Sequence, residues 1–382
     1  MKIGIVCYPT YGGSGVVATE LGKALADKGH QVHFISYKQP ARIDHFASNL
    51  FYHEVNIVNN YPLFEHPPYE TVLTSRMVDV IQYEKLDLLH VHYAIPHASA
   101  AYMAKQILRE KGIYIPVVTT LHGTDITLVG KDALYEPVVT FSINNSDGIT
   151  AVSENLKEET YRHFDIKKDI RVIPNFVDFS RFSKVNKDHF KKAIAPNGEK
   201  VLVHVSNFRK VKRVSDVVLA FKEIVKEVPA QLLLIGDGPD RSKVEALCRE
   251  LGICKDIRFL GKQDAIEELL AVSDLFMMPS GSESFGLAAL EAMACQVPVI
   301  SSNTGGVPEI NIDGKTGFLS DVGDYKKMAS DALKLLKDEN LLETFRKNAY
   351  EQAKRFDIHN ILPIYENYYR EVLEKMKESA LK

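Results

Sequence analysis

Two glutamates with a glycine and the start of an apolar helical pattern between them are the most informative residues of the chain. Glu283 and Glu291 are separated by seven residues, and the helical pattern opens at Phe285-Gly286-Leu287. Carboxylates accept hydrogen bonds from vicinal hydroxyls, and the first amides of a helix suit an anion. With a rise of about 1.5 Å per residue, Glu291 lies about 7–8 Å beyond Gly286. The spacing predicts a ligand with a phosphate at the helix start, one sugar at Glu283 and a ribose at Glu291.

A basic cluster follows the predicted strand at residues 201–205. Its five residues 209–213 contain four cations, Arg209, Lys210, Lys212 and Arg213. Arginine and lysine balance the negative charges of a diphosphate, and this interpretation is favoured over a solvated surface loop.

A glycine-rich turn, Gly12-Gly13-Ser14-Gly15, stands between the first apolar run at residues 2–6 and a helical pattern. Glycine lets the backbone approach a ligand closely, and the helix start favours a phosphate. The turn matches neither G-x-G-x-x-G nor a P-loop. A tight strand-to-helix turn without a ligand is an equally good interpretation.

Polar side chains also end two predicted strands of the first half. His90 and His92 end one strand, and His122-Gly123-Thr124-Asp125 follows the next. A histidine in such a position can bind a sugar hydroxyl or a carboxylate, although most are structural. The histidine spacing fits no common zinc site, and Asp-x-Asp is absent from the sequence, so no metal and no cofactor are expected.

The elements that must position these residues alternate between short apolar runs and longer amphipathic stretches. The predicted strands are 2–6, 31–35, 86–92, 116–121 and 148–152 in a first block and 200–205, 231–235, 257–260, 275–279 and 297–301 in a second. This alternation predicts two α/β, doubly wound Rossmann-like domains with parallel sheets, facing a central cleft. The expected domains are 1–170 and 171–360, and a terminal helix at 361–382 could pack back on the first domain.

The composition argues against nucleic-acid binding through overall charge and against a membrane protein. The 382 residues are 45% hydrophobic and 25% charged, with a formal net charge of −3. No global field draws such a chain to nucleic acid, and no run of about 18 apolar residues predicts stable membrane insertion. Four scattered cysteines predict reduced, mostly buried thiols in a cytoplasmic protein.

Taken together, these motifs resemble the family-four retaining glycosyltransferases of GT-B fold. The likeness covers nearly the whole chain. Besides Glu283 and Glu291, it rests on the segments 12–15, 122–125, 174–175, 236–239, 259–261, 305–309 and 313–318.

The resemblance implies roles for individual residues. Glu283 would hold the donor sugar, Glu291 the ribose and Lys212 the diphosphate, while the usual family arginine falls on Asn207. Either Arg209 or Arg213 would replace that arginine. The other residues implied in donor binding are Gly13, Ser14, Gly15, His122, Gly261, Phe285, Gly286 and Leu287. His122, Lys212 and Glu283 are the expected catalytic residues.

Within the family, residues 206–213 and 9–15 are most similar to members that transfer N-acetylglucosamine from UDP to the hydroxyl of L-malate in bacillithiol biosynthesis. The implied partners are therefore UDP-N-acetylglucosamine and L-malate, and a homodimer is left open. Tyr93, Thr124 and Arg76 are candidates for the acceptor site. Three alternatives stay open: another small acceptor, a UDP-N-acetylglucosamine epimerase of the same fold and a two-lobed solute-binding protein.

Overall fold

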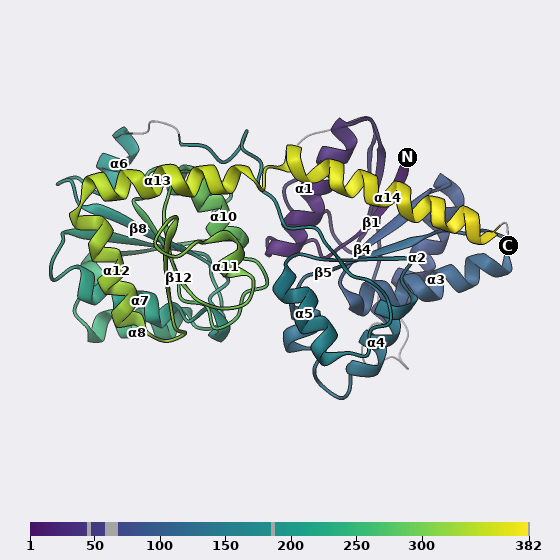
Figure 1. Cartoon of the computed structure of the whole chain (residues 1–382), viewed down its shortest axis with the longest axis horizontal. Helices are drawn as coiled ribbons and strands as arrows, with labels where there is room; N and C mark the ends of the chain where they lie inside the picture. Colours follow the sequence, from purple (N-terminus) through teal and green to yellow (C-terminus); the bar gives the residue numbers. More distant parts are fainter. Residues whose placement is uncertain (44–46, 58–67, 185–187, 381–382) are drawn as a thin grey trace. The chain divides into compact units, whose positions relative to one another are not determined.

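The computed structural model describes residues 1–43, 47–57, 68–184 and 188–380, which form two compact units. Unit 1 comprises Met1–Asn175 together with Ile358–Lys382, and unit 2 comprises Phe176–Asp357. From the sequence, the first domain was expected to end at residue 170 and the returning helix to begin at residue 361. Figure 1 shows both units with their labelled elements.

Unit 1 is built on a parallel sheet of seven strands in the order β3-β2-β1-β4-β5-β6-β7. The strands are β1 (Lys2–Val6), β2 (Gln31–Ser36), β3 (Leu50–Glu54), β4 (Leu88–His92), β5 (Val117–Leu121), β6 (Gly148–Ala151) and β7 (Arg171–Val172). The order reverses direction at β1 and β4, which is the point where such sheets bind ligands. The glycine-rich turn follows β1, and Tyr93 follows β4.

Helices cover both faces of this sheet. They are α1 (Gly13–Asp27), α2 (Tyr69–Glu84), α3 (Ser99–Glu110), α4 (Glu136–Asn145) and α5 (Glu154–His163), with π-helical turns η1 (Ala94–Ala98) and η2 (Thr124–Leu128). Leu89 and Val91 of β4 pack in one core cluster with apolar residues of α2 and α3. Because side chains alternate along a strand, His90 and His92 point to the opposite face.

The terminal helix α14 (Ile358–Ala380) belongs to unit 1 and covers that opposite face. It contacts α1, and it is drawn in yellow in Figure 1. Tyr368 Oη accepts a hydrogen bond from the Ile149 amide at 2.8 Å. Tyr369 Oη shares one with His90 Nδ1 at 2.7 Å. Residues more than 200 positions apart in the sequence therefore complete one core.

Unit 2 is built on a parallel sheet of six strands in the order β10-β9-β8-β11-β12-β13. The strands are β8 (Lys200–Val205), β9 (Ala230–Ile235), β10 (Ile257–Gly261), β11 (Leu275–Met278), β12 (Val299–Ser302) and β13 (Gly317–Ser320). Its helices are α6 (Asp188–Ile194), α7 (Val214–Ile224), α8 (Arg241–Glu250), α9 (Ile266–Ala271), α10 (Leu287–Ala294), α11 (Val307–Ile310), α12 (Tyr325–Lys337) and α13 (Glu339–Lys354), with 3-10 turns η3 (Lys210–Lys212) and η4 (Cys254–Asp256). The sheet buries Leu202, Leu234 and Met277 against α7 and α12.

The expected parallel α/β architecture is confirmed, with three strands added to it. β3 and β13 were not predicted, because Leu50–Glu54 is half polar and Gly317–Ser320 has only four residues. β7 has only two residues, too few for a hydrophobic pattern. Among the described helices, none combines the length and the apolar composition needed to cross a membrane.

The expectation that all four cysteines are reduced is wrong for one pair. Cys248 near the end of α8 and Cys254 in η4 form a disulfide, with their Cα atoms 5.1 Å apart. The chain turns between them at Gly252, whose φ of 70° lies in the left-handed region that favours glycine. Cys7 and Cys295 are free and buried, and burial raises the pKa of each thiol to about 12.

Candidate active site

The predicted donor-binding residues of the second half gather at the carboxyl edge of the unit 2 sheet. Glu283 lies in the loop between β11 and α10, and Lys212 lies in η3 after β8. Lys212 Nζ donates a hydrogen bond to Glu283 Oε1 at 2.5 Å, and Ser280 Oγ donates to the same oxygen at 2.9 Å. The basic cluster and the first glutamate, 71 positions apart in the sequence, therefore form one charged group.

Gly286 begins α10 in the way that the motif requires. Its φ of 94° lies in the left-handed region, where side chains other than glycine are strained. Leu287 is the first helical residue, so its amide has no intrahelical partner. Glu291 lies one turn further along α10 and is 5% exposed. The second glutamate therefore lies on the helix that begins at the Gly286 turn.

Phe285 contributes to the core of unit 2. Its side chain is 2% exposed, and its ring lies 5.6 Å from that of Phe356. Because this side chain is buried, only the backbone of Phe285 is placed to contact a ligand at the helix start.

Close backbone contacts position the other loops at this edge. A Cβ on Gly236 would lie 1.8 Å from Ser206 O, and one on Gly238 would lie 1.9 Å from Asn207 O. Gly236 N donates to Gly261 O at 2.7 Å. The loops after β8, β9 and β10 are thereby tied together, and they include Asn207 and Gly261, which the resemblance relates to donor binding.

The cations of the basic cluster differ in their surroundings. Arg213 Nε donates to Asp216 Oδ2 at 2.6 Å, and its side chain packs beside Gly323. Arg209 and Asn207 are exposed. Because Arg213 is held by Asp216, Arg209 is the arginine better placed to replace the usual family arginine.

In unit 1, the glycine-rich turn packs too tightly for any other residue at Gly15. A Cβ at that position would lie 2.4 Å from Thr10 O and 2.6 Å from Tyr8 O. Gly13 and Ser14 begin α1, and Ser14 Oγ shares a hydrogen bond with Tyr93 Oη at 2.6 Å. The turn after β1 is thus joined directly to the end of β4.

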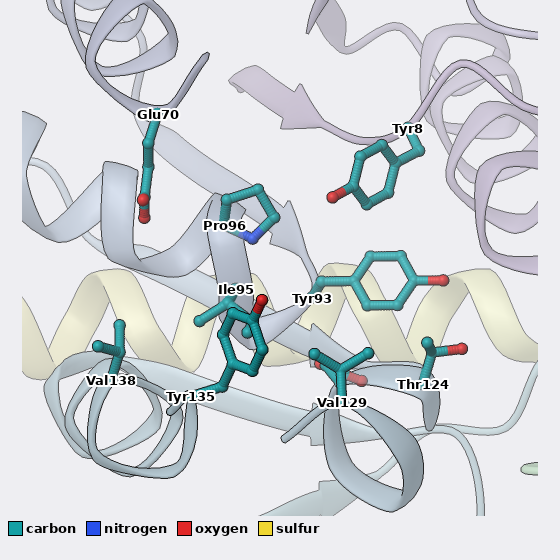
Figure 2. A pocket seen from close by; sticks show the side chains of 10 residues that line it. Tyr8, Glu70, Tyr93, Ile95, Pro96, Thr124, Val129, Tyr135 and Val138 are labelled. Atoms are coloured by element: carbon teal, nitrogen blue, oxygen red, sulfur yellow. The ribbon is translucent and has the colours of Figure 1, made fainter. Parts of the chain in front are cut away.

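A pocket of about 370 Å³ opens beside that hydrogen bond (Figure 2). In the figure, Tyr8 and Tyr93 lie on one side and Glu70 and Val138 on the other. Its lining residues are Tyr8, Glu70, Tyr93, Ile95, Pro96, Thr124, Asp125, Val129, Tyr135 and Val138. Tyr93 and Thr124, two of the predicted acceptor residues, are therefore brought together.

Arg76, the third acceptor candidate, does not line this pocket. It lies on α2, where Nη1 donates to Asp79 Oδ2 at 2.5 Å. The lining residues include no lysine or arginine. Sequence reasoning missed Tyr8, Glu70 and Tyr135, because no motif marks them. Asp125 could have been found, since it belongs to the quoted His122–Asp125 segment.

His122 lies beside the pocket in a group of buried histidines. His92 Nδ1 and His122 Nε2 share a hydrogen bond at 2.7 Å, and the ring of Tyr93 is 5.3 Å from that of His122. Burial lowers the pKa of His122 to about 3, helped by the charge of His97. The imidazole is therefore neutral near pH 7 and can donate or accept one hydrogen bond without carrying charge.

Among the described residues, one group of side chains has ligand atoms close enough together to hold a metal ion. His33, His53 and Glu84 each offer a ligand atom, and these atoms lie within 4.8 Å of one another. The group lies on β2, β3 and α2. None of its members is a predicted site residue.

Comparison with known proteins assigns the family. Residues 11–181 match the model of Glycosyltransferase Family 4, and residues 185–352 match that of glycosyl transferases group 1. The chain is 49% identical over 386 aligned residues to an N-acetyl-alpha-D-glucosaminyl L-malate synthase of Bacillus anthracis, covering 100% of both proteins.

Solved structures agree on the fold. A sucrose-phosphate synthase of Thermosynechococcus elongatus has a TM-score of 0.82 at 21% identity, covering 98% of this chain and 100% of that one. The Anabaena protein HepE, solved with UDP and glucose, has a TM-score of 0.80 at 21% identity, covering 96% and 98%. With two matching family models and a full-length relative at 49% identity, this chain belongs to family 4 of the glycosyltransferases and has the GT-B fold.

Proposed function

We propose that this protein is a retaining glycosyltransferase that moves N-acetylglucosamine from UDP-N-acetylglucosamine to the hydroxyl of L-malate, as a step of bacillithiol biosynthesis. The observation that carries the proposal is the 49% identity to an N-acetyl-alpha-D-glucosaminyl L-malate synthase over both full lengths. Residues that such a reaction needs lie at the carboxyl edges of the two sheets, where α/β folds bind ligands.

Unit 2 is proposed to bind the donor. Its Glu283 would accept hydrogen bonds from the sugar hydroxyls and its Glu291 from the ribose, because carboxylates match vicinal hydroxyls. Lys212 and the amides at Gly286 and Leu287 would bind the diphosphate. The contact between Lys212 and Glu283 supports this assignment, because it brings a cation and a sugar-binding acid within one ligand's reach.

Charge develops on the UDP diphosphate as its bond to the sugar breaks. We propose that Lys212, Arg209 and the α10 amides stabilise that charge, which is usually the largest contribution to catalysis. The resemblance implies front-side attack, in which the leaving phosphate helps to deprotonate the acceptor. Neutral His122 would donate a hydrogen bond to the donor sugar.

Unit 1 is proposed to bind the acceptor in the pocket beside Tyr93. Tyr8, Tyr93, Thr124 and Tyr135 offer hydroxyls to a small polar molecule. Malate carries two carboxylates, and the lining supplies no cation for them. We therefore propose that a cation from outside the lining residues completes the acceptor site. Arg76 pairs with Asp79 on α2.

A donor-consumption assay separates the candidate functions. The purified chain is incubated with UDP-N-acetylglucosamine, with and without L-malate, and UDP and sugar products are measured. UDP release that requires malate is expected. Conversion of the donor without malate would instead favour an epimerase, and tight sugar binding without turnover would favour a binding protein. A panel of nucleotide sugars and small acids then tests both substrates, and light scattering tests a homodimer.

A further inference from the structure

Asp125 is a buried carboxylate that connects two loops of unit 1. It lies in η2, and its side chain is 2% exposed. Its Oδ2 accepts a hydrogen bond from Ala94 N at 2.8 Å, and its Oδ1 accepts from Gly123 N at 3.1 Å and from His122 N at 3.4 Å. One side chain thereby holds the loop after β4 and the loop after β5.

The loop after β4 needs such a constraint. Tyr93 has a φ of 89°, a backbone conformation that is strained for a residue other than glycine. The surrounding hydrogen bonds are Tyr93 N to Thr120 O at 2.9 Å, Ala98 N to Tyr93 O at 3.2 Å and Ala94 N to Asp125. A strained conformation persists where its surroundings determine it, and Asp125 holds the peptide that directly follows Tyr93.

Backbone amides, and not a cation, balance the charge of Asp125. No lysine or arginine of the described residues forms an ion pair with it, whereas Asp147 of the same unit pairs with Lys105. A buried carboxylate is costly unless hydrogen bonds satisfy it. The Asp125 oxygens accept hydrogen bonds from the amides of Ala94 and Gly123, which directly follow Tyr93 and His122. The carboxylate therefore holds the loops that follow β4 and β5.

We propose that Asp125 is the positioning residue of the acceptor site. It lines the pocket together with Tyr93 and Thr124, and it fixes the backbone from which Tyr93 reaches Ser14 of the glycine-rich turn. This inference rests on the proposed function, because the pocket is taken as the acceptor site. Asp125 acts through Tyr93, His122 and Thr124 and needs no contact with the reacting atoms.

The test compares Asp125→Asn with Asp132→Asn. Asparagine keeps the size of the side chain, but its amide nitrogen faces a backbone donor, so at least one of the hydrogen bonds is lost. Asp132 is the matched control, because it is an exposed aspartate whose Oδ1 accepts from Leu134 N at 2.9 Å in the segment that follows η2. In Asp125→Asn we expect the KM for malate to rise at least tenfold and the KM for the donor to stay within twofold. The control should keep wild-type kinetics.

Hydrogen exchange supplies a measurement that does not depend on turnover. In Asp125→Asn, the amides of Ala94 and Gly123 should exchange at least tenfold faster than in the wild type, while those of β1 and β2 keep their protection. Should Asp125→Asn fail to fold, Asp125→Ser takes its place with the same expectations, because serine also removes the charge and is small enough for the buried position.

The outcomes separate this inference from the proposed function. A lower melting temperature with both KM values and both loop amides unchanged would mean a purely structural role and would overturn the inference. If the wild type shows no malate-dependent UDP release, the proposed function fails. The exchange rates then decide alone: faster exchange in both loops supports positioning by Asp125, and unchanged exchange overturns it.

Discussion

Lys212 Nζ donates a hydrogen bond to Glu283 Oε1 at 2.5 Å, across the loops that follow β8 and β11. The ion pair is partly buried, with side chains 23% and 15% exposed. In the proposed reaction both groups are needed by the donor, the lysine by its diphosphate and the glutamate by its sugar. The pair keeps the two side chains extended toward one another before the donor arrives.

Replacing Lys212 by alanine should lower kcat about 100- to 1000-fold, the usual loss when one group that stabilises transition-state charge is removed. Steady-state UDP release measures the effect. Lys210→Ala is the matched control, because Lys210 lies in the same turn and is exposed. Full turnover in Lys212→Ala would show that another group stabilises the leaving diphosphate.

Glu283→Gln and Glu291→Gln should separate sugar binding from nucleoside binding. Hydrogen bonds to a charged group contribute about 1.5–3 kcal/mol, so each change should weaken its own contact about 10- to 100-fold. Calorimetric titration should show that Glu291→Gln weakens both UDP and the full donor. Glu283→Gln should weaken only the full donor. If both variants bind UDP equally poorly, the separate assignments are wrong.

The hydrogen bond between Ser14 and Tyr93 should couple the glycine-rich turn to the acceptor pocket. Burial raises the pKa of Tyr93 to about 12, so its phenol stays protonated and can donate at neutral pH. Tyr93→Phe should raise the KM for malate about tenfold. In a double-mutant cycle with Ser14→Ala, the second change should add little to the first, because the two hydroxyls share one interaction. Additive losses would contradict this coupling.

Lowering the pH through about 6 should raise the KM for malate. Burial raises the pKa of Asp125 to about 6 against the opposing effect of its amide hydrogen bonds. Tyr8 and Tyr93 have pKa values of about 12 and His122 of about 3, so these neighbours stay neutral between pH 5 and 8. Protonation removes a charged acceptor from the amides of Ala94 and Gly123.

The stability of the fold should change in the opposite direction to activity when Asp125 is protonated. The folded pKa of Asp125 lies above its unfolded value, so the folded state binds the proton more tightly. The contribution of Asp125 to the free energy of unfolding therefore rises as the pH falls through about 6. Activity lost without a matching loss of melting temperature is the expected result. Asp125→Asn should lack the pH-dependent rise of the KM for malate near pH 6. Protonation of malate itself would instead affect the variant and the wild type alike.

Removing the hydroxyl of Tyr369 should destabilise unit 1. Tyr369→Phe leaves His90 Nδ1 without its partner on α14, and an unsatisfied buried group costs about 1–3 kcal/mol. Thermal and urea unfolding measure the loss. Tyr83→Phe is the control, because that side chain is 82% exposed and should change stability little. Equal stability of both variants would contradict a role for this hydrogen bond in holding α14.

Local patterns in the sequence were sufficient for much of the fold. Alternating strand and helix signals predicted ten of the strands, because a strand buried on both faces reads as a continuous apolar run. The short β7 and β13 and the half-polar edge strand β3 lack that signal. The proposed donor-binding residues could also be predicted from the sequence, since Glu283, Gly286 and Glu291 lie within one strand-to-helix segment.

The pocket beside Tyr93 and the disulfide were decided by tertiary structure. Tyr8, Glu70 and Tyr135 meet only because β1, α2 and α4 converge, and no spacing in the sequence encodes that meeting. Arg76 was chosen for its charge, but its position on α2 pairs it with Asp79. The sequence by itself determined which residue types follow each strand. The packing of helices on the two faces decided which of those residues meet, because contacts between distant segments depend on the whole core.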